Sequence, residues 1–215
     1  MSGGTIMIHI DINEKKYDKV IFSNTSIDIN YGSFIGIKGE SGAGKSTLLG
    51  IIGLLEDFDG NYYIDDLNVS DKEKVRCDNF AYVFQKPYLI PYLNVLDNLL
   101  MPLRNLKEDR NDYFINEVVE LLDIKDLLNR KIHNLSGGEA LRVSIGRAIL
   151  SNRKIILADE PTGSLDPKNS KNIMELFKKL NEKYNITVVM VTHSQSYDEY
   201  FDEIWDIKER KVVKL

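Results

Sequence analysis

The sequence of 215 residues predicts a single α/β domain, because three patterns of apolar residues follow one another along the chain. Up to about residue 84 the chain is rich in short strand patterns. Residues 87–151 show the spacing of helices. From residue 154 a strand pattern, a helix pattern and a second strand pattern follow in turn, which is the order that builds a parallel sheet.

The chain opens with strand patterns. Residues 6–12 alternate apolar and polar side chains, which predicts a half-buried strand. The segments KVIF, TSIDI and FIGIKG come next, and we expect breaks between them at Ser23 and Asn24 and at residues 30–32.

Residues 45–55, KSTLLGIIGLL, predict a buried helix. Asp59 and Gly60 predict a turn, and strands follow at 61–65 and 80–84. In the helical segment after them, residues 113–124 place apolar side chains at helical spacing.

The last part of the chain begins with a strand at 154–159. Asp166 precedes Pro167, which predicts a capped helix start, and the helix should continue to residue 184. Residues 187–193, TVVMVTH, form the apolar run of a buried parallel strand. A hairpin around residues 209–210 ends the chain.

Composition excludes several classes of protein. The net charge is -5, with 28 Lys and Arg against 33 Asp and Glu, so a nucleic-acid partner is not expected. The single cysteine, Cys77, rules out a disulfide framework within the chain. The longest apolar run, residues 48–55, is far shorter than the roughly 20 residues of a membrane-spanning helix.

Residues 39–46, GESGAGKS, match the phosphate-binding pattern G-x-x-x-x-G-K-[ST], between a predicted strand and a predicted helix. Glycines allow successive backbone N–H groups to converge on phosphate oxygens, and the helix N-terminus adds a positive field. Lys45 would reach the β- and γ-phosphates and Ser46 would hold Mg²⁺.

Other polar side chains follow the predicted strands. Asp159 and Glu160 end the strand IILADE, where an aspartate can act on Mg²⁺ and a glutamate can polarise an attacking water. His193 ends TVVMVTH, and Gln85 ends FAYVFQ. Because parallel strands present ligands at their carboxyl ends, we expect these side chains to converge on one nucleotide.

The stretch LSGGE, residues 135–139, precedes a long helical pattern. Ser136 and Glu139 have the spacing of a capping box. The box does not explain Gly137 and Gly138, since glycine in a helix costs roughly 1 kcal/mol against alanine. A second interpretation is that bare backbone here must approach a ligand.

Taken in order, the motifs GESGAGKST, Gln85, LSGGE, IILADEPT, SLD and His193 resemble those of the ATP-binding subunits of ABC transporters, and the resemblance covers nearly the whole chain. It implies a P-loop NTPase core with a mostly parallel sheet, an N-terminal antiparallel β subdomain and an inserted α-helical subdomain. Core and β subdomain would take about 6–85 and 152–215 of a single domain, 1–215. The helical subdomain would take 86–151 and end in the helix of the LSGGE signature.

The resemblance implies ATP and Mg²⁺ as cofactors. Tyr17 is similar to the aromatic residue that stacks on adenine, with Phe22 and Tyr31 as rival candidates. The residues implied to bind the phosphates are Gly39, Glu40, Ser41, Gly42, Ala43, Gly44, Lys45, Ser46 and Thr47.

Catalytic roles follow from the same resemblance. Ser46, Gln85 and Asp159 would serve the metal, and Gln85 would also sense the γ-phosphate. Glu160 matches the catalytic glutamate, which would act together with Lys45 and Gln85.

Three further motifs concern the γ-phosphate and a second subunit. His193 matches the histidine that contacts the γ-phosphate, and Asp166 the aspartate that communicates across a dimer. The signature residues would cover the ATP held by the opposite subunit; they are Ser136, Gly137, Gly138 and Glu139.

The resemblance also implies partners. Two copies would form a homodimer with ATP at the interface, and integral membrane permease subunits would be contacted near 86–96. The aromatic and aliphatic side chains of 86–96 equally fit a subdomain core. The expected location is the cytoplasmic face of the membrane, and the motifs look most like the lipoprotein-releasing and macrolide-export branch.

Two other functions remain open. A soluble relative acting on DNA or translation would normally carry coiled coils, zinc inserts or two cassettes, and this chain has none of them. A regulator or scaffold without useful catalysis would fit poorly with intact Lys45, Asp159, Glu160 and His193.

The sequence also departs from the family pattern. Glu139 stands where glutamine is usual, and it is followed by Ala140 and Leu141 in a run usually rich in glutamine; Gly146 replaces a common alanine.

Overall fold

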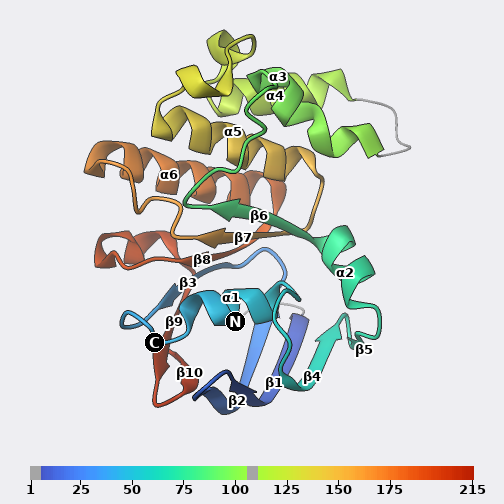
Figure 1. Ribbon diagram of the computed structural model, residues 1–215, viewed down its shortest axis with the longest axis vertical. Helices are drawn as coiled ribbons and strands as arrows, with labels where there is room; N and C mark the ends of the chain where they lie inside the picture. The colour runs from blue at the N-terminus through green and yellow to red at the C-terminus, as the bar shows by residue number, and fades with distance from the viewer. Residues whose placement is uncertain (1–5, 106–110) are drawn as a thin grey trace.

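The computed structural model describes residues 6–105 and 111–215, which form two sheets and a layer of helices (Figure 1). The strands are β1 (Ile6–Lys16), β2 (Val20–Asn30), β3 (Phe34–Lys38), β4 (Asp59–Ile64), β5 (Leu67–Asn68), β6 (Phe80–Phe84), β7 (Ile155–Asp159), β8 (Thr187–Val191), β9 (Glu203–Lys208) and β10 (Lys211–Lys214). The α-helices are α1 (Lys45–Ile52), α2 (Lys72–Asn79), α3 (Val95–Leu100), α4 (Asp112–Leu121), α5 (Gly137–Leu150) and α6 (Pro167–Tyr184). Short 3₁₀ helices are η1 (Met101–Asn105), η2 (Lys125–Leu127), η3 (Ile132–Asn134) and η4 (Gln195–Tyr200).

The smaller sheet is antiparallel, with strand order β2-β1-β4-β5. Two local predictions were wrong here. The break expected at Ser23 and Asn24 is absent, because β2 pairs with β1 on both sides of Asn24, which takes a left-handed φ of 48° within the strand. The turn expected at Asp59 and Gly60 is also absent, since both residues pair with β1 as the first residues of β4.

The larger sheet has the order β10-β9-β3-β8-β7-β6, and all of its strands are parallel except the edge strand β10. The carboxyl ends of β3, β6, β7 and β8 therefore lie along one edge, as the sequence predicted. The terminal hairpin is also confirmed, because β9 and β10 join through Glu209 and Arg210 with φ of 48° and 65°.

Alternate residues of each strand enter two separate cores on the two faces of the larger sheet. In β7, Ile156 and Ala158 pack with α5 and α6, whereas Ile155 and Leu157 pack with α1 and the antiparallel sheet. In Figure 1 α1 accordingly lies between the two sheets, and α5 and α6 cover the other face. Burial on both faces explains why these strands read as continuous apolar runs.

Helices α3, α4 and α5 form the layer farthest from the antiparallel sheet (Figure 1). They pack closely where α5 carries Gly146, because a Cβ atom there would lie 2.6 Å from Leu122 and 2.7 Å from Leu99. The departure from alanine at this position is thus a packing feature of this layer. Between the described residues of 86 and 151 no strand forms, apart from one isolated bridge between Asn94 and Lys131.

Helices α6 and α2 show where local sequence signals predict a helix and where they do not. Helix α6 begins as predicted, with Pro167 in its first turn and the Asp166 carboxylate accepting from the backbone N–H groups of Lys168 and Asn169. Helix α2 had no counterpart in the sequence interpretation, since it has no buried residue and hence no apolar stripe. In residues 6–105 and 111–215 no helix combines the length and apolar character needed to cross a membrane.

Candidate active site

The phosphate-binding loop connects β3 to α1. Gly39, Gly42 and Gly44 have φ angles of 139°, 78° and 104°, which side chains other than glycine rarely adopt. At Gly44 a Cβ atom would also lie 2.6 Å from Ile21. The loop is therefore fixed by its glycines and ends on the N-terminus of α1, which favours an anion.

Lys45 lies inside this loop. Its ammonium donates to the carbonyl oxygens of Gly39, at 2.9 Å, and Glu40, at 2.8 Å, and the residue is buried. The positive charge is thus held at the loop, within reach of a phosphate chain that follows the backbone N–H groups.

Residues distant in the sequence meet beside Lys45. The Ser46 hydroxyl donates to Oδ1 of Asp159 over 3.3 Å, and the Gln85 backbone N–H donates to the Asp159 carbonyl over 3.0 Å. Ser46, Gln85, Asp159 and Glu160 line one cleft. Burial raises the pKa of the Asp159 carboxyl, although the Ser46 hydroxyl opposes this.

These side chains fit a magnesium ion. Ser46, Gln85 and Asp159 supply hydroxyl, amide and carboxylate oxygens, which are the donors that Mg²⁺ prefers. Over residues 6–105 and 111–215 there is no cluster of three or more His, Cys, Asp or Glu side chains able to enclose a metal. The three oxygen donors of Ser46, Gln85 and Asp159 therefore suit Mg²⁺ that takes its remaining ligands from phosphate and water.

Glu160 and His193 leave neighbouring strands and meet at the same edge. The Glu160 N–H donates to the Val191 carbonyl over 3.1 Å, and Glu160 itself has a left-handed φ of 47°. This turn directs its carboxylate to the His193 imidazole, with which it forms a contact between Oε1 and Nε2. A backbone conformation that costs energy is thus located at the residue that the sequence predicts to be catalytic.

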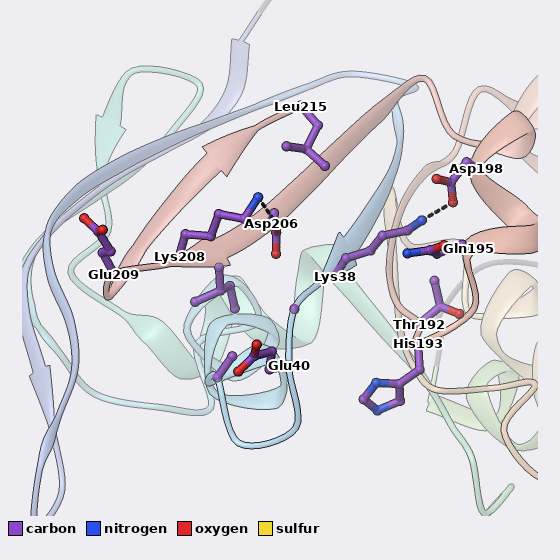
Figure 2. A pocket seen from close by; sticks show the side chains of 13 residues that line it. Lys38, Glu40, Thr192, His193, Gln195, Asp198, Asp206, Lys208, Glu209 and Leu215 are labelled. Atoms are coloured by element: carbon purple, nitrogen blue, oxygen red, sulfur yellow. Dashed lines mark hydrogen bonds and ion pairs between the residues drawn. The ribbon is translucent and has the colours of Figure 1, made fainter.

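A cleft of about 680 Å³ opens between the loop and the residues after β8 (Figure 2). Glu40 and His193 lie at one end of it, and Lys38 extends across to form an ion pair with Asp198 in η4. The loop and the segment that follows His193 are therefore joined by a charged contact.

Among the three aromatic candidates for adenine, Tyr17 alone has suitable geometry. Phe22 is fully buried in the core. Tyr31 lies in the turn before β3, at the end of that strand opposite the loop, and its hydroxyl bonds to Asp65 at 2.5 Å. Tyr17 is 54% exposed in the β1–β2 turn, and Ile21 of this hairpin borders the loop at Gly44.

The LSGGE signature begins α5 through the predicted capping box. The Ser136 N–H donates to Oε2 of Glu139 over 2.7 Å, and the Glu139 N–H donates to Oγ of Ser136 over 3.3 Å. These bonds, from the backbone and the hydroxyl of Ser136, lower the pKa of Glu139, and Arg130 adds to the effect. Glu139 therefore carries a negative charge at neutral pH.

The two glycines of the signature have no packing role within the chain. A Cβ atom on Gly137 would lie 3.6 Å from its nearest neighbour, Leu165, and one on Gly138 would lie 3.8 Å from Asn169. Both are ordinary van der Waals distances. Helical φ values and open space mean that alanine would fit at either position.

Sequence reasoning missed three residues that shape the site. Arg147 of α5 donates to the carbonyls of Pro87 and Tyr88, just after Gln85. Asn98 of α3 is fully buried and holds both the N–H and the carbonyl of Ile90. Lys15 is buried next to Tyr17. A polar residue within an apolar stripe was the available signal for Asn98.

The geometry is that of a nucleoside triphosphatase, whose parallel sheet presents a phosphate loop, oxygen ligands suited to Mg²⁺ and an acidic residue at one edge. Within that class, a family model for the ABC transporter matches residues 22–163, and the chain belongs to this family. It is an ATP-binding and ATP-hydrolysing subunit.

Known relatives span the same length. An uncharacterized ABC transporter ATP-binding protein of Methanocaldococcus jannaschii is 38% identical, over 93% of this chain and 91% of its own. The lipoprotein-releasing system ATP-binding protein LolD of Aquifex aeolicus is 37% identical, over 90% of this chain and 89% of its own. A solved ATP-binding cassette, described as a dimer in a post-hydrolysis state bound to ADP and Pi, has a TM-score of 0.81 and 34% identity, over 97% and 98%.

Proposed function

We propose that two copies of this chain close on two ATP molecules and that hydrolysis, with Glu160 as general base, reopens them to drive membrane permease subunits. The observation that carries the proposal is the pair Gly137 and Gly138, whose bare backbone serves no contact within the chain. Each costs roughly 1 kcal/mol against alanine in a helix, and a ligand from outside the chain accounts for that cost.

ATP binding rests on the loop. Backbone N–H groups and the start of α1 hold the phosphate oxygens, and Lys45 exchanges its carbonyl partners Gly39 and Glu40 for the β- and γ-phosphates. Ser46, Asp159 and Gln85 would hold Mg²⁺, which when bound would neutralise phosphate charge.

Hydrolysis needs a base and a group that fixes the γ-phosphate. Glu160, at the end of β7, accepts the proton of the attacking water. His193 contacts the Glu160 carboxylate through Nε2. When ATP binds, it exchanges this partner and donates to a γ-phosphate oxygen instead. Gln85 follows β6 at the same edge and orients the attacking water.

The signature suits the γ-phosphate of a second copy. The Ser136 hydroxyl and the N–H groups of Gly137 and Gly138 all lie at the N-terminus of α5, where donors and the helix dipole favour an anion. Ser136 and Gly137 are exposed, so a second copy can reach them. The dimeric cassette reported for a relative supports this assembly.

Asp166 immediately precedes helix α6 in the segment that follows Glu160. It caps α6 through two backbone N–H groups, and the short loop that joins it to Glu160 is buried at Pro161 and Thr162 and exposed at Gly163 and Ser164. This position supports a role in communication between the two sites.

The segment 86–96 supports a membrane partner. Tyr88 and Tyr92 are 62% and 77% exposed, whereas Asn98 and Arg147 hold the backbone beneath them. A fixed backbone with exposed aromatic rings suits a helix of a permease subunit. The chain would then work at the cytoplasmic face of the membrane as part of an exporter, in line with its likeness to a lipoprotein-releasing protein.

The test uses Gly137→Ala and Gly138→Ala, each in a Glu160→Gln background that slows hydrolysis. We expect the melting temperature to stay equal or rise, because the chain has room for the methyl groups. ATP affinity of the monomer should stay unchanged, while sedimentation with ATP should show dimerisation weakened at least tenfold. Unchanged dimerisation would refute the sandwich of two ATP molecules between two copies.

A second experiment tests the membrane partner. A permease should copurify with the tagged protein from membranes, and this copurification should be lost when Tyr88 and Tyr92 become serine.

A further inference from the structure

Lys15 is a buried charge that the proposed mechanism does not use. Only 6% of the residue is exposed, although it lies near the end of β1. The register of β1 against β4 shifts between Ile12 and Glu14, which is a bulge. The alternation that buries Ile8, Ile10 and Ile12 is thereby reversed, and Lys15 is turned to the inner side of the strand.

Rigid partners hold the Lys15 ammonium. It donates to Oε2 of Glu56 over 2.7 Å and to the carbonyl of Asp57 over 2.7 Å. Both acceptors belong to the loop after α1, and the N–H of Glu56 is itself bonded to the carbonyl of Gly50 in α1. Burial lowers the pKa of Lys15, but the contacts with Glu56 and Tyr17 together outweigh burial and raise it, so Lys15 stays charged at neutral pH.

The same ammonium lies 4.4 Å from the centre of the Tyr17 ring. Because Lys15 is buried, the ring face that it touches is the inner one, and the 54% exposure of Tyr17 belongs to the outer face and the edges. The Lys15 ammonium and the Tyr17 side chain both lower the pKa of Glu56, which shows that the three side chains form one cluster.

We propose that Lys15 is a positioning residue for the adenine base: clamped by Glu56, it fixes the ring of Tyr17 so that its outer face is ready to stack on the purine of ATP. The inference rests on the proposed stacking of adenine on Tyr17. Without the ammonium the Tyr17 ring keeps only its contact with Glu56, so more of its motion on the exposed turn must be lost when the base binds. The cation on the inner face also pulls π-electron density away from the outer face of the ring, which makes that face a better stacking partner for the electron-rich purine.

A comparison of two ligands separates this role from a structural one. ATP and inorganic tripolyphosphate bind the same loop, but only ATP has a base. We expect Lys15→Met to weaken ATP about fivefold, the size of one cation–π contact of about 1 kcal/mol, and to leave tripolyphosphate affinity unchanged in calorimetry. Lys16→Met is the matched control, because the neighbouring side chain is 65% exposed, and it should change neither affinity.

A double-mutant cycle completes the test. In a Tyr17→Leu background Lys15→Met should have no further effect on ATP. Equal weakening of both ligands, or an undiminished effect in the Tyr17→Leu background, would overturn the proposal. If Lys15→Met unfolds, Glu56→Gln takes its place, because it removes the carboxylate that holds Lys15 but leaves the ammonium. ATP affinity should again fall while tripolyphosphate affinity stays unchanged.

The two proposals fail in different ways. If Tyr17→Leu lowers ATP affinity relative to tripolyphosphate while Lys15→Met and Glu56→Gln do not, Tyr17 stacks without help from Lys15. If Tyr17→Leu leaves that ratio unchanged, the stacking itself is wrong, and the positioning role is wrong with it.

Discussion

The hydroxyl of Ser46 lies 3.3 Å from a carboxylate oxygen of Asp159, although the two residues are 113 positions apart in the sequence. Helix α1 supplies one and strand β7 the other, and they meet because β3 and β7 lie in one parallel sheet with β8 between them. The nucleotide site is thus assembled by sheet topology.

The pair leads to a prediction on stability. Burial raises the pKa of Asp159, so its proton contributes stability below the ordinary pKa of an aspartate, and this stability is lost as pH rises through the raised value. At pH 7 the charged Asp159 carboxylate therefore lowers the free energy of unfolding. We expect Asp159→Asn to raise the melting temperature at pH 7 without nucleotide or Mg²⁺, and the gain to shrink as pH falls towards 4. A melting temperature that drops at pH 7 would contradict the assignment.

Glu160→Gln should keep ATP binding and reduce turnover by about 10²–10⁴, because the amide cannot take the proton of water. Calorimetry measures binding and phosphate release measures turnover. Glu182→Gln, a change of the same kind on the exposed side of α6, is the control. Hydrolysis at the wild-type rate would remove Glu160 from the mechanism.

Lys45→Ala should weaken ATP binding by about tenfold to a hundredfold, as expected for the loss of a charge-assisted hydrogen bond of roughly 1.5–3 kcal/mol. Calorimetry against ATP measures the loss. Circular dichroism must show an intact fold, since Lys45 also bonds to Gly39 and Glu40. An unchanged affinity would exclude the phosphate contact.

Glu139→Gln should strengthen dimerisation with ATP. Glu139 is charged and close to Ser136, so it would repel a phosphate held there. Glutamine retains the oxygen that accepts from the Ser136 N–H and removes the charge. The start of α5 is therefore preserved, and a change in dimerisation reports the charge alone. Sedimentation in the Glu160→Gln background measures the effect, and equal or weaker dimerisation would refute it.

Asn98→Ala should lower the free energy of unfolding by about 1–3 kcal/mol, because it leaves buried groups of Ile90 without partners. Urea denaturation measures the change. Asn172→Ala on the exposed side of α6 should cost much less. A cost for Asn98→Ala as small as for Asn172→Ala would show that the segment at 86–96 is held by other contacts.

Local motifs made much of this site predictable. The spacing of Gly39, Gly44 and Lys45 fixes a loop by itself, and apolar runs ending at Asp159 and His193 fix the edge at which they meet. The capping box of Ser136 and Glu139 was equally visible, because it depends on neighbours in the sequence.

Features that depend on distant partners were not predictable. The bulge that buries Lys15 arises from pairing with β4, and no residue near Lys15 signals it. Asn24 carried a turn signal that pairing with β1 overrode. Arg147 could be placed on a helix, but its partners are backbone carbonyls of Pro87 and Tyr88, which have no signature in a sequence.

The contacts of Lys45 with Gly39 and Glu40 have a kinetic consequence. The loop already has its positive φ angles and its lysine inside it, so no ordering step needs to precede encounter with the triphosphate. Association should then follow diffusion and ionic strength, and differences in affinity among loop variants should appear in the residence time of the nucleotide.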